Sequence, residues 1–404
     1  HDFLNPLLSI RKQYLTPPAP DWLAWVIFVW SLPFVWIAVS MSVRRAVNAG
    51  LTAWVGLFVL LPGLNFALML LLSAMPSRGS YSFAAPKPIP QLDRRIHSAL
   101  TGVAASVLIC LVMLGISVYA YEDYGAALFL GTPIMMGAVS AFLYNRPSAR
   151  GLGGSILVAE ISVAVAGMVL LLFAFEGIIC LAMLFPIGAA MGAFGALIGY
   201  TVAAVTPGKR SSLVVPVLVL PIFAGVESAA PDLPLYEVVT SVEIEAPPQE
   251  VWPHVIGFSE LPPPSNWYFQ LGIAYPMRAT IHGSGVGAVR HCEFSTGPFV
   301  EPITVWDQPR RLAFDVVSQP PPMHELSPYR HVHPPHLDGY LRCKRGEFRL
   351  IELPGGRTRL EGSTWYEYDI YPQQYWILWS DLLIHRIHTR VLHHIKHLSE
   401  SNAS

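Results

Sequence analysis

Histidines gather in the second half of the chain, where twelve of the fourteen follow residue 250. Four of them fall in one Pro-rich stretch: His324, His331, His333 and His336. His393 and His397 have the i, i+4 spacing that places two imidazoles on one helix face, and imidazole is a common ligand of transition metals. No cysteine or carboxylate spacing completes a recognised site, and these histidines alternate with Pro and Arg. We therefore expect no metal.

A second kind of chemistry would need acids and bases in an apolar pocket. His291, Glu293 and Glu301 lie on neighbouring expected strands and carry the groups used in general acid and base catalysis. The alternative, which we favour, is that they are ordinary outward-facing or paired strand residues. The sequence has no Gly-x-Ser-x-Gly elbow and no cysteine in a recognisable catalytic context. We assign no catalytic residue, expect no cofactor and favour a binding protein over an enzyme.

The first half of the chain is apolar enough to lie in a bilayer. Hydrophobic residues make up 53% of the sequence and charged residues 13%, and the mean hydropathy is +0.45. Six apolar runs are long enough to cross about 30 Å of hydrocarbon as helices: residues 22–43, 51–75, 99–121, 125–144, 155–175 and 177–205. A seventh run, 211–226, is shorter and contains Pro216 and Pro221, and we favour a kinked span there over an interfacial segment. The expected membrane domain covers residues 21–228 and follows an N-terminal arm of residues 1–20.

Basic residues in the loops indicate how these spans are oriented. The arm and the second, fourth and sixth loops together hold ten Lys or Arg, whereas the other loops hold only Arg44 and Arg45. Because such residues favour the cytoplasmic side, the N-terminus is expected there. Seven spans put the following domain outside the cytoplasm and six keep it inside, and we favour the outside. The net charge of −1 offers no basic surface for nucleic acid.

Two features inside the spans stand out. Glu160 is the one ionisable residue well away from a span end, and charge in hydrocarbon costs several kcal/mol, so such a residue is functional by default. The alternative, which we favour, is a protonated or hydrogen-bonded glutamate near an interface. Four glycines recur at intervals of three and four residues along the sixth span, where they let helix backbones approach closely: Gly188, Gly192, Gly195 and Gly199.

The loop after the first span has the sequence Arg44-Arg45-Ala-Val-Asn-Ala-Gly50-Leu-Thr-Ala-Trp54 and continues to Pro62. Residues 40–80 resemble a family of small bacterial inner-membrane proteins of unknown function, whose signature is an Arg-Arg-Leu-His-Asp loop followed by Gly, Trp and Pro. This chain departs from that signature, since Ala-Val-Asn replaces Leu-His-Asp. The resemblance implies no activity, and we expect a multi-pass protein of the bacterial inner membrane.

From residue 229 onward the chain has the patterns of a soluble α+β domain. Residues 238–246 alternate apolar and polar side chains as a strand does, and Pro247 and Pro248 suit the first turn of a short helix that ends near 258. Further strands are expected at 268–275, 278–282, 288–294, 300–307, 311–317, 346–353 and 357–369. The chain ends in an expected helix, 374–397, with one apolar stripe: Trp376, Trp379, Leu383, Ile387, Val391, Ile395 and Leu398.

Several pieces of this half match one superfamily in the same order: Val242-Glu-Ile-Glu-Ala-Pro-Pro-Gln-Glu-Val-Trp252, Gly285-Val-Gly-Ala-Val-Arg290, Trp306-Asp-Gln-Pro-Arg-Arg-Leu-Ala-Phe314 and Gly356-Arg-Thr-Arg-Leu-Glu361. Residues 236–400 thereby resemble the START-like or SRPBCC superfamily of polyketide cyclases and lipid-transfer domains. The resemblance implies a helix-grip fold, in which a curled antiparallel sheet surrounds a C-terminal helix over a deep apolar cavity. It implies no single reaction. The expected architecture is an α-helical membrane domain followed by this α+β domain at 229–404.

The chain departs from the superfamily pattern at residues 318–345, an insertion rich in Pro and His. Loops of this length without regular structure are usually functional or disordered, and we expect a mobile lid over the cavity. Its residues are Met323, His324, Tyr329, His331, His333 and His336. Aromatic residues crowd the expected strands and the start of the last helix, where core packing and a ligand cavity explain them equally well. The residues we assign to ligand binding are Phe269, Tyr275, Trp365, Tyr368, Trp376, Trp379, Leu383 and Ile387.

Together these patterns predict a membrane-anchored module that binds a hydrophobic molecule, a lipid or an isoprenoid, at the bilayer surface. Its expected partners are membrane lipids and that small molecule. One alternative is a cyclase-like enzyme that acts on a membrane-derived substrate. Another is an accessory protein whose spans pack against other membrane subunits.

Overall fold

The fold is taken from a computed structural model of the chain. It describes residues 94–148, 150–205, 233–329 and 332–401, together with short stretches between residues 34 and 76. The expected arm at 1–20, most of the first expected span at 22–43 and the expected seventh span at 211–226 lie outside the described residues. Of the second expected span, the structure describes α2 (Leu64–Ala74), an apolar helix of 11 residues.

Four helices in the described part of the chain are long and apolar enough to cross a membrane. They are α3 (Arg94–Leu114), α4 (Thr132–Asn145), α5 (Leu152–Leu172) and α6 (Ile178–Val205). Helix α3 continues as the π-helical turn η4 (Gly115–Ala120), and α4 follows the π-helical turn η5 (Ala127–Gly131). These match the expected third to sixth spans. Helix α4 is mostly buried, whereas the other three expose much apolar surface of the kind that lipid covers.

Helices α4 and α6 pack through glycine, as the spacing in the sixth expected span predicts. A Cβ atom at Gly195 would lie only 2.0 Å from the carbonyl oxygen of Ile134 in α4, so no larger residue fits there. Helix α5 packs beside them and presents the Glu160 side chain toward Gly192 of α6. The Oε1 atom of Glu160 has no hydrogen-bond partner among the described residues.

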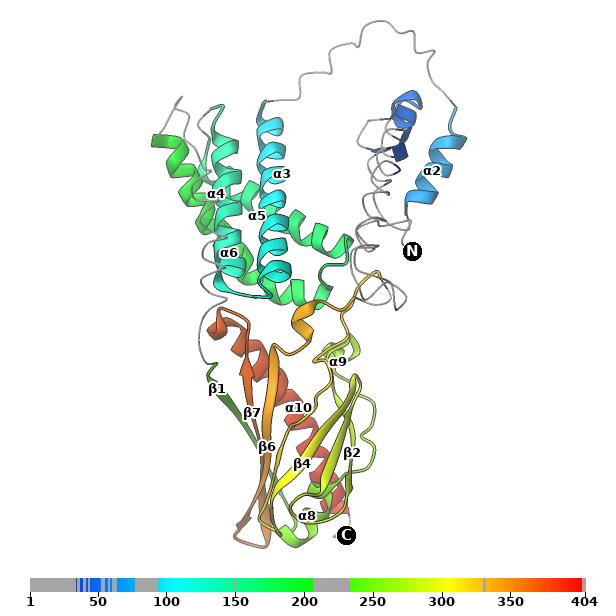
Figure 1. Ribbon diagram of the computed structural model, residues 1–404, viewed down its shortest axis with the longest axis vertical. Coiled ribbons are helices and arrows are strands. Elements are labelled where there is room, and N and C mark those ends of the chain that lie inside the picture. Colours follow the sequence, from blue (N-terminus) through cyan, green and yellow to red (C-terminus); the bar gives the residue numbers. More distant parts are fainter. Residues whose placement is uncertain are drawn as a thin grey trace, which may run out of the picture.

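The second half of the chain forms a seven-stranded sheet in the order β1-β7-β6-β5-β4-β3-β2, with all neighbours antiparallel. Its strands are β1 (Leu235–Ile244), β2 (Pro276–His282), β3 (Val289–Phe294), β4 (Gly297–Asp307), β5 (Arg311–Asp315), β6 (Leu341–Leu353) and β7 (Arg357–Tyr368). The 29-residue helix α10 (Gln373–Ser401) lies along the curled sheet, and α8 (Pro248–Ile256) packs against its later turns (Figure 1). A curled sheet that holds a terminal helix is the expected helix-grip arrangement.

Two expected elements are wrong. Residues 268–275 do not form a strand; the short helix α9 (Trp267–Gln270) is followed by a turn at Gly272, whose φ is +124°. An aromatic run of this length fits a strand or a helical turn equally well. The positive φ of Gly272 interrupts an extended backbone, so a strand does not continue through it. The insertion is also shorter than expected, because β6 begins at Leu341 and pairs with β7 from there. It contains one helical turn, η6 (Pro335–Leu337).

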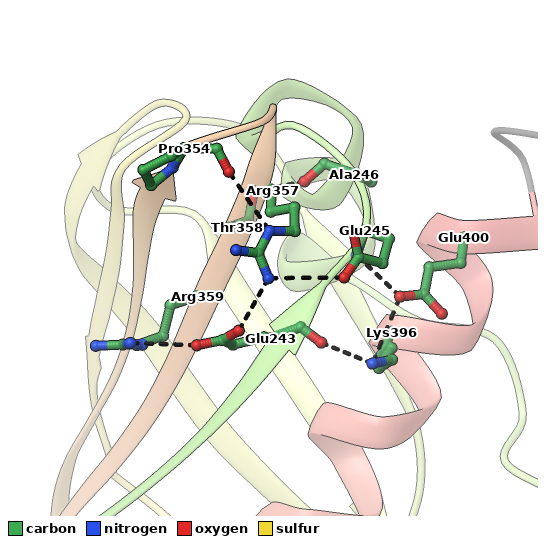
Figure 2. Close-up of polar contacts among 9 residues, drawn as sticks. All are labelled: Glu243, Glu245, Ala246, Pro354, Arg357, Thr358, Arg359, Lys396 and Glu400. Atoms are coloured by element: carbon green, nitrogen blue, oxygen red, sulfur yellow. Dashed lines mark hydrogen bonds and ion pairs between the residues drawn. The ribbon is translucent and has the colours of Figure 1, made fainter.

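The last turns of α10 are fastened to one end of the sheet (Figure 2), which is the end that lies far from the apolar helices (Figure 1). Lys396 Nζ donates to the carbonyl oxygen of Glu243 at 2.8 Å, and Glu400 Oε1 accepts the N–H of Glu245 at 2.9 Å. Arg357 pairs with the Glu243 carboxylate at 3.3 Å. Exposed ion pairs contribute about 0–1 kcal/mol each, so these contacts position the helix end more than they stabilise the domain.

The apolar helices and the sheet domain are packed against each other. Leu114 and Phe129 from the helices share one buried cluster with Trp376 of α10. The rings of Phe129 and Trp376 meet edge to face with centroids 5.2 Å apart. At the border, the N–H of Tyr371 donates to the carbonyl oxygen of Tyr124 at 2.9 Å. The two halves therefore share one apolar interface. We call the end of the helices that lies at this interface the docking end.

Arginines gather at the opposite end of the same helices. This arginine end comprises Arg94, Arg95, Arg146 and Arg150. There Arg95 Nε donates to the Tyr144 hydroxyl at 2.9 Å, and Arg150 donates to Ser98 Oγ at 2.7 Å. The loops at the docking end carry acidic residues instead: Glu122, Asp123 and Glu176. In this part of the chain the arginines thus gather at one end of the four helices and the acidic loop residues at the other.

Candidate functional site

A cavity of about 680 Å³ runs from the apolar helices into the sheet domain. Its lining from the helices includes Phe129, Val163, Gly167, Leu170, Leu181 and Phe185. Its lining from the sheet domain includes Phe258, Phe314, Tyr368, Trp376, Leu383 and Ile387. Ligand pockets have volumes of about 300–1,000 Å³ and mostly apolar walls, so the size and lining suit a hydrophobic molecule.

The eight residues assigned to ligand binding from the sequence separate into two groups. Four line the cavity: Tyr368, Trp376, Leu383 and Ile387. Four do not line it: Phe269, Tyr275, Trp365 and Trp379.

Each residue outside the cavity has another neighbour. Phe269 lies in α9, and its ring centroid is 5.7 Å from that of Tyr275. Trp365 follows the cavity-lining Thr364 on β7. Because side chains alternate along a strand, Trp365 points to the outer face of the sheet. There the Arg345 guanidinium carbon lies 4.8 Å from the centroid of its ring. Trp379 packs against Tyr375 at the interface of the two halves, with ring centroids 6.5 Å apart.

Three of the residues assigned to a lid contact the apolar helices: Met323, Tyr329 and His336. Met323 and His336 line the cavity, and Met323 is buried with Ile179 of α6. The Tyr329 hydroxyl donates to the carbonyl oxygen of Leu172 at the end of α5.

The other assigned lid residues are placed outside the cavity wall. His324 is exposed, and His333 bonds to Asp338 at 2.8 Å. His331 lies outside the described residues. The described insertion therefore forms part of the cavity wall and is tied to the apolar helices.

Of the three acid and base candidates, Glu301 alone lines the cavity. It forms a buried ion pair with Arg290, whose guanidinium lies 5.3 Å from the Phe314 ring. Burial raises the pKa of Glu301, and the Arg290 charge opposes that rise. Glu293 instead pairs with an arginine at the surface, and His291 lies against another histidine ring. The favoured interpretation of these two as ordinary strand residues fits their positions.

His388 is a cavity residue that the sequence analysis missed. One ring nitrogen bonds to Thr240 Oγ1 at 3.1 Å and the other to Thr364 Oγ1 at 2.8 Å. Burial, with a smaller contribution from His385, lowers the pKa of His388 to about 4, so the ring is neutral at pH 7. Its spacing of four residues from Ile384, a buried residue of α10, could have indicated this inward position.

A second missed group lies at the docking end. Glu176, Cys180 and His336 each place one potential ligand atom within 4.8 Å of the others. Their order in the chain gives no metal-binding spacing, since 156 positions separate Cys180 from His336. Only the packing of the insertion against α6 brings them together. All four cysteines, including Cys292 and Cys343, are free thiols.

Comparisons with known proteins add similarities of structure. No family model matches the sequence, and no curated protein matches it. An aromatase/cyclase from Streptomyces sp. R1128 is 14% identical and matches with a TM-score of 0.29 over 42% of this chain and 97% of that chain. Norcoclaurine synthase from Thalictrum flavum is 13% identical, with a TM-score of 0.29 over 43% of this chain and 90% of that chain. The protein XoxI from Bacillus cereus is 16% identical, with a TM-score of 0.28 over 42% of this chain and 98% of that chain.

Proposed function

We propose that this protein is anchored in a membrane by its apolar helices and takes up a hydrophobic molecule, a lipid or an isoprenoid, at the bilayer surface. The observation that carries the proposal is the cavity shared by the helices and the sheet domain. A pocket confined to the sheet domain would open to water. A pocket that continues between apolar helices suits a ligand that comes from hydrocarbon.

The walls of the cavity support entry from the side of the helices. Met168 of α5 and Phe185 of α6 both line the cavity, yet 59% and 52% of their surfaces are exposed. These side chains therefore reach from the cavity to the helix surface that lipid would cover. A ligand that passes between them keeps its apolar surface out of water, which avoids a cost of about 25 cal/mol for each Å² exposed.

Two bulky substitutions test this proposal in the full chain. Gly167→Phe fills the helix part of the cavity and Leu383→Trp fills the sheet part, so each should reduce both lipid recovered in native mass spectra and binding of a fluorescent lipid. Gly153→Phe is the matched control, because Gly153 lies on α5 with open space around it. Uptake that survives Gly167→Phe but not Leu383→Trp would contradict entry between the helices. Uptake that survives both would contradict the binding function.

Glu301 and His388 favour a second candidate function, a cyclase-like enzyme that acts on a membrane-derived substrate. Both polar groups line a mostly apolar cavity, which is where such a reaction would need an acid or a base. The test compares the bound molecule from wild type with that from Glu301→Gln and from His388→Gln. Recovery of a chemically altered molecule from wild type and of its precursor from either variant would favour the enzyme. The same molecule from all three would favour binding alone.

We further propose that the sheet domain lies outside the cytoplasm, with the inner membrane of a bacterium as the expected location. Because basic residues favour the cytoplasmic side, the arginine end belongs in the cytoplasm, and the sheet domain packs at the opposite end. Helix α6 runs about 42 Å from the docking end to Val205, whereas β1 begins again beside the docking end. Val205 and the start of β1 thus lie at opposite ends of the helices, which is the arrangement that an expected seventh span would connect.

A further inference from the structure

We propose that Glu176, Cys180 and His336 bind one divalent transition metal ion, zinc by the nature of the donors. Their potential ligand atoms lie within 4.8 Å of one another and supply one carboxylate oxygen, one sulfur and one imidazole nitrogen. This combination of oxygen, sulfur and nitrogen donors is typical of zinc, which accepts all three.

The separation between Cys180 and His336 is close to the one that a tetrahedral ion needs, since Cys180 Sγ lies 3.0 Å from His336 Nε2. Glu176 places a ligand atom within 4.8 Å of one from each of the other two residues. The 3.7 Å contact of Glu176 Oε1 is with the other ring nitrogen, Nδ1, and one ion binds only one of the two nitrogens. Bonds of about 2.0–2.3 Å to a tetrahedral zinc ion place neighbouring donors about 3.3–3.8 Å apart. Binding of one ion therefore requires side-chain rotations that bring the Glu176 carboxylate and the Cys180 sulfur to the same ring nitrogen of His336.

Neighbouring groups hold the donors where they are. The Glu325 carboxylate of the insertion accepts the N–H groups of Ile179 and Cys180, at 3.2 and 3.1 Å, and so fixes the first turn of α6. The ring of Tyr124 meets the His336 imidazole edge to face, with centroids 5.3 Å apart. Orienting contacts of this kind around metal ligands contribute to affinity.

The site is shielded from water. The side chains of Glu176 and His336 are each 11% exposed. All three donors line the cavity, so the remaining coordination position of the ion would face it. The idea that an oxygen of a bound lipid takes that position rests on the proposed function, whereas metal binding itself does not.

The ion would join the two halves of the protein. Glu176 precedes α6 and Cys180 lies in its first turn, whereas His336 belongs to η6 in the insertion. A metal bond between them would fasten the insertion to the apolar helices. Removal of the ion should therefore increase amide hydrogen exchange in residues 332–340.

The test uses the full chain in detergent, washed with a chelator and then loaded with zinc or cobalt. About one ion per chain is expected, and cobalt should give the thiolate charge-transfer band and the strong visible bands of a tetrahedral site. Cys180→Ser should abolish the thiolate band, and His336→Gln and Glu176→Gln should each weaken metal binding at least tenfold. Cys343→Ser and His333→Gln are matched controls, because Cys343 also lines the cavity and His333 lies in the same insertion.

Three results would overturn the proposal. The first is wild-type protein that binds no ion after loading, and the second is a cobalt spectrum without a thiolate band. The third is full metal binding by Cys180→Ser. The two wild-type measurements, the number of ions bound and the cobalt spectrum, decide the matter even if a variant fails to fold. Uptake of fluorescent lipid is measured separately on metal-free protein, so failure of the metal site and failure of lipid binding can be told apart.

Discussion

The ring of His388 lies between two threonine hydroxyls, and this position ties the stability of the sheet domain to pH. A neutral imidazole can donate to one hydroxyl and accept from the other, whereas the charged ring can only donate. Its pKa is about 4 in the folded protein and near 6.5 in an unfolded chain. At pH values between these two, the unfolded chain binds more protons than the folded protein does. Free energy of unfolding that is present at pH 7 is therefore lost as the pH falls from about 6.5 to about 4.

The first prediction follows from that difference. Between pH 7 and pH 4.5, wild type should lose about 2 kcal/mol more free energy of unfolding than His388→Gln does, as measured by denaturant titration of the full chain. His393→Gln, an exposed position on the same helix, should behave like wild type. Equal acid sensitivity of wild type and His388→Gln would show that the ring is not held neutral by the fold.

Single residues also mark the limits of what the sequence predicts. Leu383 and Ile387 could be placed in the cavity because a stripe on an amphipathic helix must face the sheet. The aromatic character of Trp365 suggests a cavity residue, but Trp365 lies one residue out of phase with the inward-facing residues of β7. Cys180 and His336 could not be joined at all, since the contact that unites them is tertiary.

Helix α10 tests whether the cavity is a space or a solid core. Ile395 is fully buried in the core and does not line the cavity, whereas Leu383 borders it. Ile395→Ala should therefore cost about 2–5 kcal/mol of unfolding free energy, and Leu383→Ala less than about 2 kcal/mol, because the site already borders empty space. Denaturant titrations of both variants make the comparison. Equal losses, together with intact lipid binding by Leu383→Trp, would show that α10 covers a solid core.

At the scale of elements, six of the seven later strands that the sequence predicts lie close to strands of the sheet, and runs of apolar residues predict α3 to α6. The insertion was harder to predict. Its Pro and His residues indicated a loop, but its wall position follows from contacts such as Tyr329 with Leu172 and Met323 with Ile179, which join segments far apart in the chain. Whether it moves when a ligand enters stays a prediction.

For the whole molecule, the division of charge between the arginine end and the docking end leads to a prediction about sidedness. A cysteine in place of Ser404 should react with a membrane-impermeant thiol reagent once the outer membrane is permeabilised, while the inner membrane is still intact. The unsubstituted chain corrects for the four native thiols. Labelling that appears only after the inner membrane is breached would place the sheet domain in the cytoplasm.

The shared apolar interface also has a consequence for biosynthesis. A chain is made from its N-terminus, so α3 to α6 are complete before β1 leaves the ribosome. The apolar surface that will meet Trp376 thus exists before the residues that cover it, and α10, which supplies that tryptophan, is made last. A ribosome that stalls before residue 373 would release a protein whose docking end has lost that cover, and quality-control proteases could recognise it by this exposed surface.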